Sequence, residues 1–102
     1  MMDLNRIRQL MPREELLAQL AEECDELGHA ALKLRRAITG KNPTPVTEDE
    51  ATEMILEETA DLELCLMVLE YDRPLPAGKI KMYIERKADR WLRRLEENRK
   101  EE

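Results

Sequence analysis

Two pairs of carboxylates, each pair spaced three positions apart, are the residues of this sequence best suited to chemistry. Glu23 and Glu26 form the first pair, and Glu58 and Asp61 form the second. In a helix, residues i and i+3 share a face, so each pair presents two acids in one direction. Unpaired acids are costly to bury, and hard divalent cations such as Mg²⁺ bind oxygen ligands of this kind. The spacing therefore indicates a cation site, provided that two helices bring the pairs together.

The surroundings of each pair predict how it is oriented. The second pair belongs to a stripe that is otherwise apolar or small, which is typical of an interior face: Ala51, Met54, Glu58, Asp61, Cys65 and Val68. The first pair lies beside a heptad-like core stripe: Leu16, Leu20, Cys24, Leu27, Ala31, Leu34 and Ile38. If the two helices pack antiparallel, as a short connection favours, the four carboxylates converge. Glu22 stands beside the first pair as a further ligand, a base for a water molecule, or a surface acid.

Helix signals divide the chain into a short helix and three long ones. A short amphipathic helix over residues 3–10 precedes a long helix over residues 12–38, with Gly40 as its stop. Pro43 and Pro45 predict a loop over residues 41–46. Thr47 and Glu50 form a capping box that starts a second long helix over residues 48–70. A loop over residues 71–78 leads to a third over residues 79–97, and the last few residues are expected to fray.

The amino-acid composition limits the classes of protein to which the chain can belong. The chain has 102 residues, of which 42% are hydrophobic and 39% charged, with no Phe, one Trp and two Tyr. This length fits one domain, and no segment has the alternation of a strand, so the sequence predicts an all-α protein. A core with so few aromatic residues suits the space between helices, and a second copy would extend it. We therefore expect an oligomer.

Charge and cysteine content suggest partners and compartment. The net charge of −6 argues against a nucleic-acid binder. No Lys or Arg occurs between Lys41 and Arg73, whereas residues 79–100 are rich in both. Cys24 and Cys65 match no zinc motif and are expected to be small buried residues in a reducing compartment. With no apolar run at the N-terminus and no segment near ~20 apolar residues, we expect a cytoplasmic protein without a membrane partner.

The order of the acids resembles a known family. The pattern E-E-x-x-E at Glu22, Glu23 and Glu26, followed by E-x-x-D at Glu58 and Asp61, is similar to that of the MazG-type all-α nucleoside triphosphate pyrophosphohydrolases. The likeness extends over residues 11–95. It implies that residues 1–102 form a single MazG-like domain, an antiparallel helical bundle completed by assembly into a homodimer or homotetramer. It also implies hydrolysis of a nucleoside triphosphate to the monophosphate and pyrophosphate, in the housekeeping of the nucleotide pool.

The resemblance assigns roles by position. Glu23, Glu26, Glu58 and Asp61 would bind Mg²⁺, with Mn²⁺ as an alternative ion, and Glu22 would be the catalytic residue that takes a proton from water. A later Lys-x-x-Arg element contacts the phosphates in many relatives, and Lys87 and Arg90 match it. The chain departs from the family in two ways: the stretch between the acid pairs is longer, and Ala88 replaces an aromatic residue that often follows the Lys.

Two other classes of protein compete with this interpretation. A non-catalytic helical dimer or interaction module would account for the heptad-like stripes and the separated charges, but not for the inward acids. A di-iron carboxylate bundle would use Glu26-x-x-His29, which has the E-x-x-H spacing of such sites. These sites need two such elements, however, and His29 is the only His in the chain.

Overall fold

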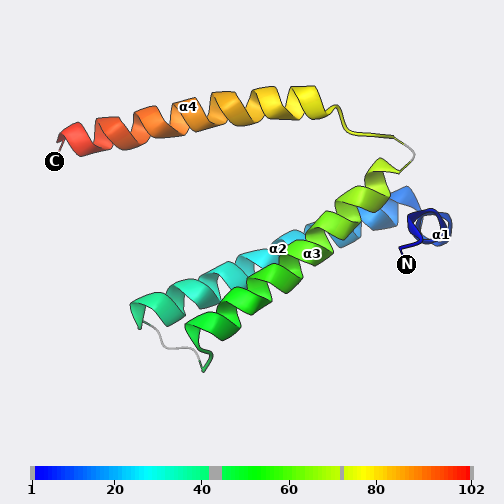
Figure 1. The fold of residues 1–102 in the computed structure, drawn as a ribbon, viewed down its shortest axis with the longest axis horizontal. Helices are drawn as coiled ribbons and strands as arrows, with labels where there is room; N and C mark the ends of the chain where they lie inside the picture. The colour runs from blue at the N-terminus through cyan, green and yellow to red at the C-terminus, as the bar shows by residue number, and fades with distance from the viewer. Residues whose placement is uncertain (1, 42–44, 72, 102) are drawn as a thin grey trace.

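A computed structural model describes residues 2–41, 45–71 and 73–101 of the chain. Within these residues four helices and no strand are present, which confirms the all-α class (Figure 1). The helices follow the order α1 (Leu4–Leu10), α2 (Arg13–Thr39), α3 (Glu48–Glu70) and α4 (Ala77–Glu101). Residues 42–44 and 72, which belong to the two predicted loops, and Glu102 at the charged end lie outside the described residues.

The helix boundaries follow from local capping chemistry. The Asp3 side chain accepts a hydrogen bond of 2.9 Å from the backbone N–H of Arg6 and so caps α1. Gly40 ends α2 with a φ of 70°, in the left-handed region that glycine adopts without strain. The predicted capping box is confirmed, because the Glu50 N–H donates to Thr47 Oγ1 at 3.1 Å and the Thr47 N–H donates to Glu50 Oε1 at 3.2 Å.

The ends of α4 differ from the prediction. The helix begins at Ala77, inside the predicted loop, and continues to Glu101, past residue 97. The prediction places Gly78 in the loop over residues 71–78, whereas in the structure it lies in the first turn of α4. The charged terminal residues were expected to fray, yet 98–101 continue the helix.

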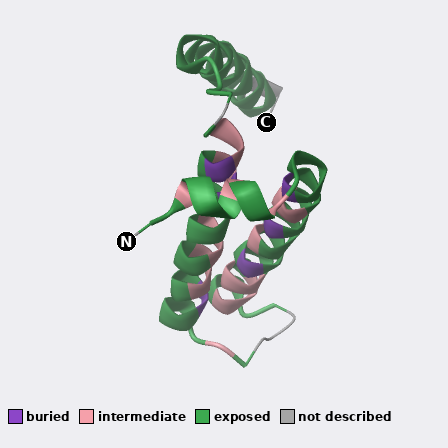
Figure 2. Cartoon of the chain, turned by 90° about the vertical axis from the view of Figure 1, so that its right-hand side faces the viewer, coloured by how far each residue is buried: buried purple, intermediate pink, exposed green. Residues whose placement is uncertain are grey.

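An antiparallel hairpin of α2 and α3 forms the packed part of the chain, and α1 lies across it near the end of α3 (Figure 1). Figure 2 shows the buried residues on the facing sides of the two long helices. The side chains of this small core come from both helices: Leu16, Ala30, Ala51, Cys65 and Val68. Since most of these residues are small, the two helices can approach closely.

The core face of α2 matches the predicted stripe in part. Leu16 is buried as predicted, and three other residues of the stripe are half-buried: Leu20, Leu27 and Leu34. Cys24 and Ala31 are exposed, however, and the residues before them, Glu23 and Ala30, are buried instead. The core face is therefore rotated from the predicted stripe by less than the roughly 100° that separates neighbouring residues. Apolar residues occupy a broad arc of α2, so their spacing did not identify which part of the arc faces α3. The consequence is that Glu23, rather than Cys24, points into the hairpin.

Helix α4 stands apart from the hairpin. All of its residues from 77 to 99 are exposed, and Figures 1 and 2 show it separated from α2 and α3. The predicted bundle, which included this helix, is therefore not formed by the described part of a single chain. No helix among the described residues combines the length and apolar character needed to cross a membrane.

Candidate metal centre

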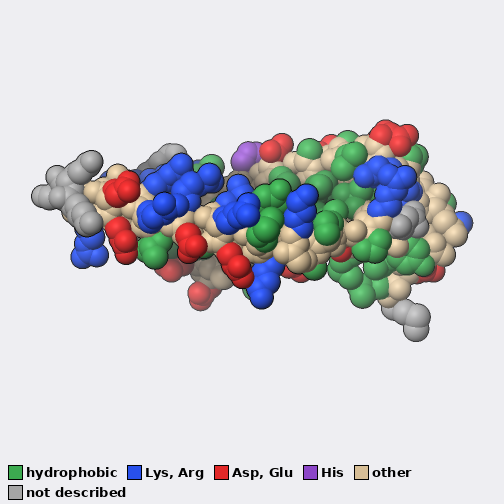
Figure 3. All heavy atoms as spheres, turned by 90° about the horizontal axis from the view of Figure 1, so that it is seen from above, with side chains coloured by type: hydrophobic (Ala, Val, Ile, Leu, Met, Phe, Trp, Pro, Cys, Tyr) green, Lys and Arg blue, Asp and Glu red, His purple; other side chains and the backbone are tan. Residues whose placement is uncertain are grey.

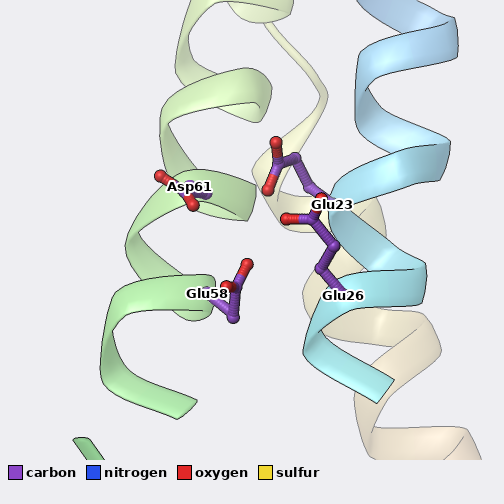
Figure 4. Close-up of side chains that lie close together, drawn as sticks. All are labelled: Glu23, Glu26, Glu58 and Asp61. Carbon is purple, nitrogen blue, oxygen red and sulfur yellow. The ribbon is translucent and has the colours of Figure 1, made fainter. Parts of the chain in front are cut away.

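Four carboxylates meet halfway along the hairpin. Glu23 and Glu26 extend from α2 toward α3, and Glu58 and Asp61 come from the facing helix (Figure 4). One carboxylate oxygen from each residue lies within 4.8 Å of one from every other. The antiparallel packing thus brings together the two acid pairs that the sequence singled out, and it does so from two helices only.

Glu23 is the most enclosed member of the group, since only 8% of its surface is exposed. Gln19 Nε2 donates a hydrogen bond of 2.7 Å to Glu23 Oε1. The other oxygen, Oε2, is buried and has no hydrogen-bond partner, and the same is true of Glu58 Oε2. A buried carboxylate oxygen without a donor is costly. Each helix therefore presents an oxygen that a cation would satisfy.

The charges within the group repel one another. The Glu58 carboxylate, through a shared hydrogen bond and through its negative charge, raises the pKa of Glu26 above the ordinary value of 4.5. Burial raises the pKa of the Cys65 thiol, and the charges of Glu23 and Asp61 raise it further. Repulsion among acids that share a small volume thus raises the pKa of Glu26, and it adds to the effect of burial on the pKa of Cys65. A proton or a cation relieves the repulsion.

Two open hollows adjoin the carboxylates and differ in character. The first, of about 390 Å³, has a mixed polar wall: Glu26, His29, Ala30, Lys33, Met54, Glu57 and Glu58. The second, of about 170 Å³, lies toward α1 and is mostly apolar: Ile7, Met11, Leu16, Gln19, Glu23, Asp61, Leu64, Cys65 and Val68. A ligand bound at the carboxylates can thus extend toward a polar surface in one direction and an apolar one in the other.

The remaining predicted residues lie outside the group. Glu22 is exposed on α2, next in sequence to Glu23. Lys87 and Arg90 are exposed on α4 and share a shallow concavity with Tyr83 and Arg86. Because α4 does not pack on the hairpin, the structure does not bring these two basic residues to the carboxylates.

Sequence reasoning missed the role of Gln19. The signal was available, because Gln19 and Glu23 are four residues apart and such pairs meet on a helix surface. The predicted core stripe leaves both residues beside the core, whereas in the structure Glu23 is buried and Gln19 is half-buried. His29, the only His in the chain, lines the polar hollow and is exposed.

Comparison of the chain with models of protein families, with curated proteins and with solved structures finds no match.

Proposed function

We propose that this protein is a MazG-like, Mg²⁺-dependent nucleoside triphosphate pyrophosphohydrolase that cleaves an NTP or dNTP into the monophosphate and pyrophosphate. The proposal combines the resemblance of the acid motifs with the convergence of their four side chains. Its substrate class comes from the resemblance, and its metal dependence is supported by the chemistry of the donor set.

The observation that carries the proposal is the pair of unpartnered buried oxygens, Glu23 Oε2 and Glu58 Oε2, within a group of four carboxylates. An all-oxygen donor set suits hard cations such as Mg²⁺ and Mn²⁺ rather than softer metals. The iron alternative would require imidazole ligands, but the single His29 lies outside the group of four. Glu23, Glu26, Glu58 and Asp61 would hold the ion.

The protein's own residues supply the rest of the chemistry. A divalent cation at this position would neutralise triphosphate oxygens and make an attacking water more acidic. Glu22, exposed at the edge, is the proposed proton acceptor, and Glu26 is an alternative because its raised pKa makes it a stronger base. Lys87 and Arg90 would stabilise negative charge on the phosphates, which requires α4 to approach the hairpin.

Assembly into a homodimer or homotetramer is part of the proposal, since the exposed apolar residues of α4 need a partner surface. Within the described residues both cysteines are free thiols, which suits a reducing compartment such as the cytoplasm. The same exposed helix favours a second candidate, a non-catalytic helical interaction module. That module would not need the convergent acids.

Pyrophosphate release from a panel of ribo- and deoxyribonucleoside triphosphates, with Mg²⁺ and with EDTA, tests the proposal. The expected result is Mg²⁺-dependent release of pyrophosphate together with the matching monophosphate. Release of inorganic phosphate instead would point to a different reaction. The absence of any product, together with no effect of Mg²⁺ on the melting temperature, would favour the interaction module.

A further inference from the structure

The two carboxylate oxygens of Glu23 have different surroundings. Oε1 accepts a hydrogen bond of 2.7 Å from Gln19 Nε2, whereas Oε2 is buried and has no hydrogen-bond partner among the described residues. The side chain extends from α2 into the space between the two helices (Figure 4). Since only 8% of this residue is exposed, bulk water has little access to either oxygen. One oxygen is therefore engaged, and the other is left for a ligand.

The position of Gln19 along α2 determines the direction in which it draws Glu23. Gln19 precedes Glu23 by four positions, which is about one helical turn, and Glu26 follows Glu23 by three. The amide of Gln19 and the carboxylate of Glu26 thus come from opposite sides of Glu23 along the helix. The hydrogen bond draws Oε1 toward the N-terminal end of α2. Oε2 is the oxygen that remains for an ion shared with the other acids.

The surroundings of Gln19 favour this hydrogen bond over other contacts. Gln19 is half-buried and lines the hollow of about 170 Å³, in which apolar side chains such as Ile7, Met11 and Leu64 are its neighbours. An ionised carboxylate only accepts hydrogen bonds, so the amide turns its N–H groups toward Glu23. A hydrogen bond to a charged group is also stronger in a mostly apolar surrounding than in water. The wall of this hollow therefore holds the amide on the acid.

A carboxylate with one engaged oxygen does not suit all divalent cations equally. Ca²⁺ takes about six to eight oxygen ligands in flexible geometry and often binds both oxygens of one carboxylate. Mg²⁺ is smaller and requires an arrangement close to octahedral, so it depends more on ligands that are fixed in place. Holding Glu23 to one oxygen removes a ligand that Ca²⁺ could use. The same restraint prepares the single oxygen that Mg²⁺ needs.

We propose that Gln19 is a positioning residue that holds Glu23 to a single metal-binding oxygen and so shifts the selectivity of the site from Ca²⁺ toward Mg²⁺. Gln19 acts through Glu23 and does not itself bind the ion. An outer hydrogen bond that orients a ligand commonly changes metal affinity by about 10–100-fold when it is removed. The inference rests on the metal site of the proposed function, but it does not depend on the nature of the substrate.

Titration calorimetry of the full chain with Mg²⁺ alone and with Ca²⁺ alone tests this role. The protein is freed of metal with EDTA, the chelator is removed, and both ions are titrated at pH 7 without nucleotide. We call the dissociation constant for Mg²⁺ divided by that for Ca²⁺ the selectivity ratio. A general loss of structure would weaken both ions and leave this ratio unchanged, whereas release of Glu23 would raise it.

Two substitutions of Gln19 separate its hydrogen bond from its packing. Gln19→Met keeps the length of the side chain and suits the apolar hollow, so the hairpin should fold, but it removes the donor. We expect it to raise the dissociation constant for Mg²⁺ about tenfold and the selectivity ratio at least about fivefold. Gln19→Lys keeps an N–H donor four positions before Glu23. Its added charge should weaken both ions alike and leave the selectivity ratio near the parental value.

Gln9→Met provides the matched control for weak binding elsewhere. The chain carries 23 Asp and Glu residues, and Figure 3 shows acidic side chains spread over the visible face of the molecule, so loose binding of both ions is expected. Gln9 is exposed on α1, and its amide oxygen accepts a hydrogen bond from Arg6 rather than from a residue of the acid group. The same chemical change at this position should leave both dissociation constants near their parental values.

The possible failures are distinguishable. If the parental chain binds both ions and Gln19→Met keeps the parental selectivity ratio, the role of Gln19 is wrong while the proposed hydrolysis stands. Equal increases of the ratio in Gln19→Met and Gln19→Lys would also exclude the hydrogen bond as the cause. A parental chain that binds neither ion would overturn the metal site, and with it both proposals. A shifted ratio in a chain that releases no pyrophosphate would overturn the hydrolysis alone.

Discussion

At the scale of the residue, Glu23 is the side chain whose surroundings say most about the site. Gln19 satisfies one of its oxygens and nothing in the described chain satisfies the other. If this buried acid had a purely structural role, each of its two oxygens would be expected to accept a hydrogen bond. The arrangement instead holds one oxygen in place and leaves the other free for a ligand, as occurs where an outer hydrogen bond orients a metal-binding group.

Removing a charge from α3 should abolish turnover without unfolding the chain. We expect Glu58→Gln and Asp61→Asn each to lower Mg²⁺-dependent pyrophosphate release by about 100-fold or more. Helical content, measured by circular dichroism, should persist, because the apolar core of the hairpin is unchanged. Glu63→Gln serves as the control, since this exposed acid of α3 lies outside the group of four. Near-parental rates in the first two variants would refute the assignment of the site.

The raised pKa of Glu26 predicts how stability depends on pH in the absence of metal. The folded state binds the proton of this group more tightly than the unfolded state does, so the contribution is fully present below pH 4.5 and is lost as the pH rises through the folded pKa. Melting temperatures measured in EDTA between pH 4 and pH 7 should fall more for the parental chain than for Glu26→Gln. Identical pH profiles would show that the group is not under this repulsion.

Added Mg²⁺ should oppose this loss near neutral pH. At pH 7 fewer protons compete with the ion for the carboxylate oxygens, and the ion binds only the folded chain, so the melting temperature should rise with Mg²⁺ concentration. At pH 4 protons compete for the same oxygens, and the rise should be much smaller. Glu63→Gln should behave like the parental chain, whereas Glu58→Gln should lose most of the effect. An unchanged melting temperature at pH 7 would contradict a metal site.

At the scale of the element, Gly28 within α2 and Gly40 at its end should respond oppositely to substitution by Ala. A Cβ added to Gly28 meets no atom within 4 Å, so close approach of another helix of the described chain does not explain this glycine. Gly28→Ala should stabilise the protein by about 0.5–1 kcal/mol. Gly40→Ala should destabilise it by about 1 kcal/mol or more, because its φ of 70° strains any other residue. Urea unfolding of both variants checks the contrast, and a destabilised Gly28→Ala would indicate an interface at that position.

Local chemistry made most helix boundaries predictable from the sequence. Each of these boundaries depends on a residue and its neighbours within a few positions, so it can be predicted from a short stretch of sequence. The examples are the N-cap at Asp3, the C-cap at Gly40 and the capping box at Thr47. The facing of α2 was less predictable, because apolar residues surround more than half of this helix. The observed core face includes Glu23 and leaves Cys24 exposed, although it keeps Leu16.

The candidate site was also largely predictable, for a similar reason. Each acid pair is a local pattern, and the antiparallel hairpin that joins the pairs follows from a short loop. The environment of Lys87 and Arg90 could not be predicted. An amphipathic pattern indicates that one face of a helix packs against another element, but it does not identify that element. That information depends on contacts between distant segments or between copies.

At the scale of the whole molecule, the proposed homodimer allows a test of which hairpin α4 approaches. One inactive variant carries Glu58→Gln in the hairpin, and the other carries Lys87→Gln with Arg90→Gln on α4. If α4 completes the site of the partner copy, one of the two sites in a mixed dimer combines the intact hairpin with the intact helix, so random pairing should recover about a quarter of the parental activity. A mixture of Glu58→Gln with Asp61→Asn should recover none. Without recovery in the first mixture, α4 would not complete the site in trans.

The uneven distribution of Lys and Arg has a practical consequence for digestion by trypsin. Nine of the 17 such residues lie within residues 77–101, and α3 contains none. Early cuts will therefore fall on α4 if that helix is uncovered, since exposed and mobile backbone is cleaved first. A helix held on a second copy would resist the enzyme and become sensitive on dilution. The survival of the C-terminal peptide thus gives a gel-based reading of how far the chains have assembled.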